Sequence, residues 1–208
     1  MQHIPQYSCL DSDMTHIEVR SATVGSYDNN VYVLVDPATK ESILVDTPYE
    51  ADVILGLTKG TKVRAIVFTH TDADHLGAFD AVTSGIDAPI LVHSADAARL
   101  PRTPDRLVDE GDTIEFGQSS VHVLHTPGHT PGCICLVTDG VLISGDTLFP
   151  GGPGNTKRPG GDFDAIISGI RDKLFTLPDE TQVYPGHGKS TTVGAEKPHL
   201  SEWIERGW

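Results

Sequence analysis

Two histidines and two aspartates fall within six consecutive residues of the stretch FTHTDADHLG, Phe68 to Gly77. Imidazole nitrogens and carboxylate oxygens are ligands that proteins offer to zinc, iron and manganese. The stretch continues from the β-branched run VRAIVF, which predicts a buried strand. We therefore predict a metal-binding loop at the end of a strand.

Three later segments also end an apolar run in a glycine-rich turn that carries a metal-ligand side chain. They are HTPGHTPG (125–132), SGDTLF (144–149) and YPGHG (184–188). Glycine lets the backbone pack closely around a crowded centre. Together the four segments supply enough nitrogen and oxygen ligands for two divalent ions that share a bridging carboxylate. The candidate ligands are His70, Asp72, Asp74, His75, His129, Asp146 and His187.

Each candidate also has a purely structural interpretation. Asp74 could cap a helix that begins near Leu76, His129 could be a turn residue, and His187 could be a surface histidine. The occurrence of all four segments in one chain favours the metal site. Nothing comparable supports the remaining histidines of this region, which we assign to structure or surface: His93, His122 and His125.

In this order the four segments resemble the metallo-β-lactamase superfamily, whose motif His-x-His-x-Asp-His is followed by a distant His, Asp and His. YDNNVYVLVDPAT, LFPGGPGNT and YPGHGKSTTVGAEK are similar to the glyoxalase II branch, the hydroxyacylglutathione hydrolases. The resemblance implies an α/β fold, a four-layered αβ/βα sandwich. It also implies two metal positions bridged by Asp146, with His70, Asp72 and His129 at the first and Asp74, His75 and His187 at the second.

Asp72 departs from the family motif, which has a histidine in that place. As a ligand, Asp72 would make the centre less positive and a weaker Lewis acid, and would favour manganese or iron beside zinc. Alternatively, Asp72 lies outside the ligand shell and the first metal is weak or absent. We expect ligation, because an unpaired buried carboxylate is costly, and two divalent ions, zinc foremost.

The reaction that the resemblance implies is hydrolysis of a thioester or related ester by a hydroxide held between the metals, with Asp74 as the catalytic residue that orients it. Lys157 and Arg158 are candidates for binding an anionic part of the substrate. About twenty residues follow YPGHG, too few for the C-terminal helical domain of glyoxalase II. The resemblance therefore supports the reaction class more than glutathione as a substrate.

Three alternatives remain. One is an iron-dependent persulfide dioxygenase of the same superfamily, with one metal held by His70, His129 and Asp146. Another is a hydrolase of a lactone, a β-lactam or a phosphoester. The third is a binding protein that lost catalysis through Asp72.

The pattern of apolar residues predicts strands and helices over most of the chain, which we interpret as one domain, residues 1–208. Asp139-Gly140 predicts a hairpin, and the loop 149–162 is rich in glycine and proline. The predicted strands are 30–36, 42–47, 63–70, 88–93, 112–116, 121–126, 133–138, 141–147 and 181–187. The predicted helices are 49–60, 76–86, 163–177 and 198–206.

The composition of the chain limits the kinds of molecule that it is expected to bind. A net charge of −14 over 208 residues argues against nucleic acid and anionic membranes. The N-terminal MQHIPQYSCL lacks the pattern of a secretory signal, and no apolar run suffices for a membrane span. The three cysteines, Cys9, Cys133 and Cys135, are too few for a disulfide framework, and we interpret the latter two as core residues. We expect a cytoplasmic enzyme with a small-molecule substrate; the oligomeric state stays open.

Overall fold

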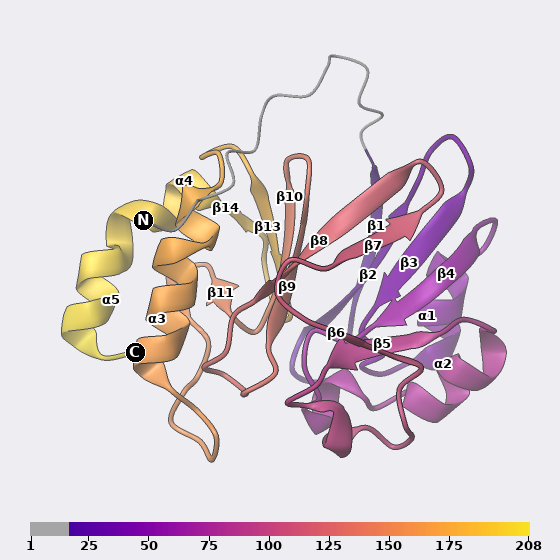
Figure 1. Ribbon diagram of the computed structural model, residues 1–208, viewed down its shortest axis with the longest axis horizontal. Helices are drawn as coiled ribbons and strands as arrows, with labels where there is room; N and C mark the ends of the chain where they lie inside the picture. The colour runs from indigo at the N-terminus through magenta and orange to yellow at the C-terminus, as the bar shows by residue number, and fades with distance from the viewer. Residues whose placement is uncertain (1–16) are drawn as a thin grey trace.

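The computed structural model describes residues 17–208, in which two mixed β-sheets pack face to face with helices on both outer faces (Figure 1). This is the four-layered αβ/βα sandwich that the family resemblance implies, and the fold class is confirmed. The predictions about MQHIPQYSCL and Cys9 lie outside the described residues.

The first sheet holds six strands that lie side by side in chain order. Its first three strands pair antiparallel and the remaining ones pair parallel. The strands are β1 (Glu18–Val24), β2 (Asn29–Val35), β3 (Glu41–Val45), β4 (Lys62–Val67), β5 (Ile90–His93) and β6 (Arg106–Val108).

The second sheet also has six strands, and only its β10–β13 pair is parallel. In spatial order they are β14 (Thr191–Thr192), β13 (Gln182–Pro185), β10 (Val141–Gly145), β9 (Ile134–Thr138), β8 (Ser119–His125) and β7 (Thr113–Phe116). A small separate ribbon joins β11 (Leu148–Phe149) to β12 (Gly152–Pro153).

Helices cover the outer face of each sheet. The first sheet carries α1 (Ala51–Leu57) and α2 (Phe79–Gly85), and the second carries α3 (Phe163–Asp172), α4 (Val193–Glu196) and α5 (Leu200–Arg206) (Figure 1). Short 3₁₀ turns lie at Ala73–His75, Ala97–Arg99, Leu174–Thr176 and Lys197–His199.

Three hydrophobic cores hold these layers together. Strand β2 shows how, because Leu34 faces the core between the two sheets while Val33 faces the core under α1 and α2. Burial on both faces explains why VYVLV, residues 31–35, is a run without a charged residue or a regular polar alternation. The third core, between the second sheet and its helices, includes Leu142, Ile166 and Trp203. Each such fully buried aliphatic side chain contributes about 1.5–3 kcal/mol relative to exposure.

The strand directions bring the ligand-bearing loops to one edge of the sandwich. Strands β8, β10 and β13 all run the same way, so their carboxyl ends meet at the same edge. The first sheet joins them there through two backbone hydrogen bonds, from Ile134 N to Thr69 O (2.9 Å) and from Asn30 N to Gly186 O (2.8 Å).

Most predicted elements agree with the structure in place and type, with differences at their ends. The Asp139-Gly140 hairpin is confirmed, since Thr138 pairs with Val141 around it. The helix predicted to stop at Gly60 ends at Leu57, with Thr58 as its C-cap residue. The predicted helix 163–177 ends as a helix at Asp172 and continues as a 3₁₀ turn.

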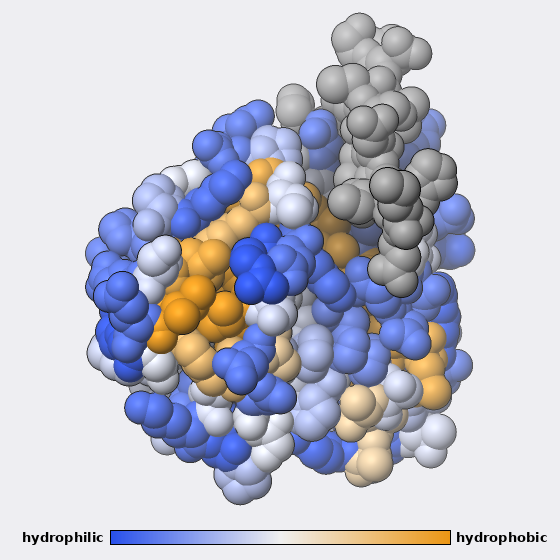
Figure 2. Space-filling view, turned by 60° about the vertical axis from the view of Figure 1, so that its left-hand side comes forward, coloured by the Kyte–Doolittle hydropathy of each residue, from blue (hydrophilic) through white to orange (hydrophobic). Residues whose placement is uncertain are grey.

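The face shown in Figure 2 is largely hydrophilic, with a larger hydrophobic area left of centre and a smaller one near its right edge. Ile204 of α5 is one of the exposed large hydrophobic residues, at 48%. Within residues 17–208, the structure contains no helix with the length and apolar character that crossing a membrane demands.

Candidate metal centre

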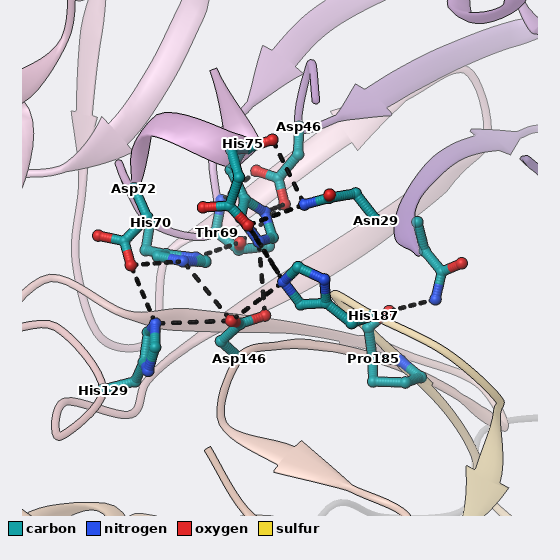
Figure 3. A network of polar contacts seen from close by, with 12 residues as sticks. Asn29, Asp46, Thr69, His70, Asp72, His75, His129, Asp146, Pro185 and His187 are labelled. Atoms are coloured by element: carbon teal, nitrogen blue, oxygen red, sulfur yellow. Dashed lines mark hydrogen bonds and ion pairs between the residues drawn. The ribbon is translucent and has the colours of Figure 1, made fainter. Parts of the chain in front are cut away.

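The seven predicted ligands converge at this edge of the sandwich (Figure 3). They come from four loops: the turn after β4, the loop after β8, the end of β10 and the end of β13. Their donor atoms form three overlapping groups, each within 4.8 Å: His70, Asp72 and His129; His70, His75 and Asp146; Asp74, His75 and His187. The convergence is a finding, whereas the role of each residue as a ligand stays a prediction.

We call Asp74, His75, Asp146 and His187 the second-position group. The Nε2 atoms of His75 and His187 are 3.2 Å apart. His187 Nε2 lies 3.4 Å from Asp74 Oδ2, and His75 Nε2 lies 3.5 Å from Asp146 Oδ1. Four donors thus point at one another, an arrangement that a shared cation stabilises.

The tautomers of the two imidazoles follow from their other hydrogen bonds. Nδ1 of His187 lies 2.8 Å from the carbonyl oxygen of Tyr27, and Nδ1 of His75 lies 3.0 Å from Asp46 Oδ2. Because these oxygens only accept, both Nδ1 atoms donate. Each neutral ring therefore turns the lone pair of Nε2 towards the centre, as a metal ligand must.

The first-position group consists of His70, Asp72, His129 and the shared Asp146. His129 Nε2 is 3.1 Å from Asp72 Oδ2 and 3.5 Å from Asp146 Oδ2. His70 Nε2 is 3.7 Å from Asp72 Oδ2 and 4.0 Å from Asp146 Oδ2. Asp146 contacts both groups, and Figure 3 shows it between them.

Several features show that these residues fit a divalent metal. Among the described residues, the buried atoms His70 Nε2 and Asp146 Oδ1 have no hydrogen-bond partner, which is costly unless a further group satisfies them. Gly186 leaves the space open, since a Cβ there would lie 2.1 Å from Asp146 Oδ1. The donors are imidazole and carboxylate, without thiolate, which suits zinc, iron or manganese.

Burial and mutual charge perturb the proton affinities of the centre. Burial and the neighbouring His75 hold the pKa of His70 well below its usual range. Burial would also lower the pKa of His75, but the carboxylates of Asp146 and Asp46 raise it well above its usual range. The pKa of Asp146 is well below its usual range because nearby imidazoles outweigh its burial. In the absence of a metal, the centre therefore favours a proton on His75 and an ionised Asp146.

Residues that were not predicted from the sequence hold the candidate ligands in place. Asp46 accepts hydrogen bonds from His75 and from both N and Oγ1 of Thr69. The Thr69 hydroxyl lies 3.1 Å from His70 Nδ1. Nδ2 of Asn29 donates to Asp74 Oδ2 over 3.0 Å. The signal for Asp46 was in the sequence, because ILVDT ends its strand as LISGDT does before Asp146.

Asp72 lies at the centre but is bound by two arginines. Nη2 of Arg158 donates to Asp72 Oδ1 over 2.7 Å, and Nη1 donates to Oδ2. Nη2 of Arg99 donates to the same Oδ1 over 2.5 Å. Burial would raise the pKa of Asp72, but its close contacts with the His129 ring and the guanidinium of Arg158 hold it well below its usual range.

The predicted anion-binding residues have different surroundings. The side chain of Lys157 is exposed, whereas Arg158 is half-buried against Asp72. Substrate binding by either residue stays a prediction. The helix-cap interpretation of Asp74 does not apply, because the N-cap of α2 is Ala78 and that of the 3₁₀ turn is Asp72.

The other histidines lie in different contacts. His122 contacts Thr113 Oγ1 at 3.0 Å. His93 and His125 stack with ring centroids 3.9 Å apart, and with Asp109 they form a fourth group of potential metal donors. The rings are almost parallel, at 14°. Since each nitrogen lone pair lies in its ring plane, parallel rings cannot both point at one ion, and we keep their structural interpretation.

Cys133 and Cys135 are both buried, at 1% and 0% exposure, as core residues are. Burial raises the pKa of both thiols, that of Cys135 to about 11. Neither is therefore a thiolate near neutral pH.

A cleft of about 510 Å³ opens beside the second-position group. It is lined by Tyr27, Tyr49, Ala73, Asp74 and His187. The side chain of Tyr27 is 67% exposed at its mouth. Asp74 and His187 therefore lie in an open cleft whose wall includes two tyrosines.

Comparison with known proteins places this centre in a family. Residues 24–187 match the model of the metallo-β-lactamase superfamily. The chain is 36% identical over 170 residues to a hydroxyacylglutathione hydrolase of Polaromonas, covering 79% of this chain and 64% of that protein. It is 33% identical to the probable metallo-hydrolase YqgX of Bacillus subtilis, covering 86% and 93%.

A solved structure of similar sequence contains metal. The structure of TTHA1623 in a di-iron-bound form has a TM-score of 0.75 and 32% identity, covering 86% of this chain and 97% of that one. The family match spans all seven converging residues. This chain belongs to the metallo-β-lactamase superfamily, and its relatives include metallo-hydrolases.

Proposed function

We propose that this protein is a metal-dependent hydrolase that cleaves a thioester or a related ester. The observation that carries the proposal is the second-position group. There, two imidazole lone pairs and two carboxylates face one point at the edge of an open cleft. Such a set holds a metal and leaves a side accessible to substrate.

The residues that would hold the metal are His75, His187, Asp74 and Asp146, with His70 beside them. A divalent ion bound there would lower the pKa of coordinated water and polarise the substrate carbonyl. The donor set suits zinc, with iron or manganese as alternatives.

Asp74 is the candidate catalytic residue. Its Oδ2 accepts a hydrogen bond from Asn29 Nδ2, and the Asp74 side chain, which lines the cleft, is 27% exposed. The remaining lone pairs of this carboxylate can accept a hydrogen bond from the attacking water and hold it against the carbonyl carbon. Asn29 fixes the carboxylate for that role.

The walls of the cleft contribute binding. Tyr27 and Tyr49 offer aromatic surface to the acyl or thiol part of a substrate. The hydroxyacylglutathione hydrolase of Polaromonas supports a thioester as the first substrate to test. This chain spans only 64% of the length of that relative. The name of the relative therefore does not carry glutathione over to this chain, and glutathione as the thiol is part of the proposal.

The persulfide dioxygenase alternative is weaker. It needs the Nε2 lone pair of His129 for a mononuclear iron, together with His70 and Asp146. That nitrogen lies 2.9 Å from Nη1 of Arg158, so the guanidinium competes with an iron ion for its lone pair. Oxygen consumption with a thiol persulfide separates the dioxygenase from the hydrolase.

A substrate panel on metal-loaded protein tests the proposal. It should hold glutathione and non-glutathione thioesters, a lactone, a β-lactam and a phosphodiester. We expect thioester hydrolysis that chelation abolishes and added metal restores. Hydrolysis of only another ester would replace the substrate class, and no chelator-sensitive turnover of any substrate would reject the function.

A further inference from the structure

The first-position group already contains a cation of the chain itself. The guanidinium of Arg158 lies against Asp72 with two nitrogens, one on each carboxylate oxygen. Two parallel N–H donors on a carboxylate are the geometry in which arginine binds most specifically. The Asp72 side chain is 11% exposed and that of Arg158 is 29% exposed, so solvent screens the pair only in part.

The same guanidinium also takes the metal-binding lone pair of His129. Nδ1 of this histidine lies 2.8 Å from the carbonyl oxygen of Asn155, to which it must donate. In the neutral ring Nε2 is therefore the acceptor, and Nη1 of Arg158 lies 2.9 Å from it. Nη1 thus bridges His129 Nε2 and Asp72 Oδ2, the two atoms that a first metal would bridge.

A metal and this nitrogen compete for the same two atoms, His129 Nε2 and Asp72 Oδ2. A zinc ion lies about 2.0–2.1 Å from a ligating imidazole nitrogen. At that distance the ion would occupy the lone pair of His129 Nε2 that Nη1 contacts, so Arg158 must give up this contact before a metal can bind both His129 and Asp72. Of the three donors that belong to the first position alone, only His70 Nε2 then remains, because Asp72 and His129 contact Arg158.

The second-position group has no such competitor. Within residues 17–208, no lysine or arginine makes a hydrogen bond or ion pair to any of its members: Asp74, His75, Asp146 and His187. No lysine or arginine among the described residues therefore compensates the carboxylates of Asp74 and Asp146, which leaves them open to an external cation. The charge of Asp72, in contrast, is already compensated by Arg158 and Arg99.

We propose that the guanidinium of Arg158 takes the place of the first cation, so that the chain binds one divalent ion, in the second-position group. The inference rests on the proposed metallohydrolase function. It also explains the departure at position 72. A carboxylate pairs with a guanidinium through two oxygens, which an imidazole cannot do, so Asp72 holds Arg158 rather than a metal.

Metal content tests this directly. The full-length protein is loaded with zinc, freed of loose ions by gel filtration and analysed by elemental mass spectrometry, and a titration with cobalt follows the visible absorption. We expect one ion per wild-type chain and a second, weaker cobalt step in Arg158→Met, because Met fills the space without the charge. The double variant Asp72→His/Arg158→Met, which has the family motif, should bind two ions.

Arg99→Met is the matched control. It removes the same positive charge from Asp72 but leaves Arg158 between Asp72 and His129. We expect it to keep a stoichiometry of one, which separates occupancy of the position from a general electrostatic effect. Circular dichroism checks that each variant is folded.

Two tightly held ions in the wild type, with thioester hydrolysis retained, would overturn this inference and leave the proposed function standing. A second ion in Arg99→Met as readily as in Arg158→Met would also overturn it. Absence of any bound ion from the wild type would overturn both the inference and the function.

Discussion

Nδ1 of His75 donates to Asp46 Oδ2 over 3.0 Å, while Nε2 of the same ring faces Asp146 Oδ1 at 3.5 Å. The two aspartates end corresponding strands, β3 and β10, in the two halves of the sandwich. Asp46 positions the ring of His75, and Asp146 is a candidate ligand of the same metal as His75. The tautomer of His75 is thus set by a residue that is not among the converging donors.

Asp46→Asn should weaken metal binding by roughly 10- to 100-fold, the usual cost of losing a supporting carboxylate. Asparagine has the same shape and tolerates the left-handed backbone at this position (φ 60°), but its NH₂ group cannot accept from His75. Competition with a chromogenic chelator measures the affinity.

Asp36→Asn provides the control for that experiment. Asp36 is also buried and accepts hydrogen bonds from the Ala38 and Thr39 amides, but it makes no contact with the centre. We expect it to lower the free energy of unfolding and leave the metal affinity unchanged. Equal loss of affinity in both variants would show that Asp46 acts through stability alone.

Gly186→Ala should abolish metal binding in a protein that still folds. Its Cβ would lie 2.1 Å from Asp146 Oδ1 and 2.9 Å from His75 Cε1, so both side chains must move. Gly188→Ala is the matched control, because no atom lies within 4 Å of its Cβ although its φ is +67°. It should cost about 1–2 kcal/mol of stability and keep the metal. Full metal content in Gly186→Ala would contradict the assigned position of the ion.

Metal affinity should rise with pH. The carboxylate of Asp146, against the opposing effect of burial, raises the pKa of both His75 and His187. Because a raised pKa keeps the proton on the metal-free ring to higher pH, the ion must displace it, and binding releases protons. Calorimetric titrations in buffers of different ionisation enthalpy count these protons below pH 7. Zero proton release there would mean that neither imidazole is a ligand.

Tyr27→Ala should raise KM about two- to tenfold, the value of an aromatic contact, with little change in kcat. The backbone carbonyl that accepts from His187 remains. Trp208→Ala removes another exposed aromatic side chain, 59% exposed, and should not change KM. Steady-state kinetics with the best thioester substrate measures KM and kcat of both variants. An unchanged KM in Tyr27→Ala would show that the substrate does not bind along Tyr27 in the cleft.

The sequence predicted strands well where both faces are buried, as in β2, because a long apolar run has few alternatives. Strand β1 was missed, since its residues are mostly exposed or half-buried and only its pairing with β2 makes it a strand. The convergence of seven residues was predictable because each follows a strand end with a glycine-rich turn.

The pairing of Asp72 with Arg158 was beyond sequence reasoning. The two residues are 86 positions apart, and Arg158 belongs to a loop without a regular pattern. A lone arginine there is equally consistent with a solvated loop or with substrate binding. Only the folded loop brings its guanidinium to His129 as well.

The central claim is that these side chains hold a divalent metal. Anomalous diffraction at the zinc absorption edge, from crystals of zinc-loaded protein, tests it most directly. The predicted result is a strong peak within bonding distance of His75 Nε2, His187 Nε2 and Asp146. A map without density there, or with its only peak beside His93, Asp109 and His125, would contradict the account.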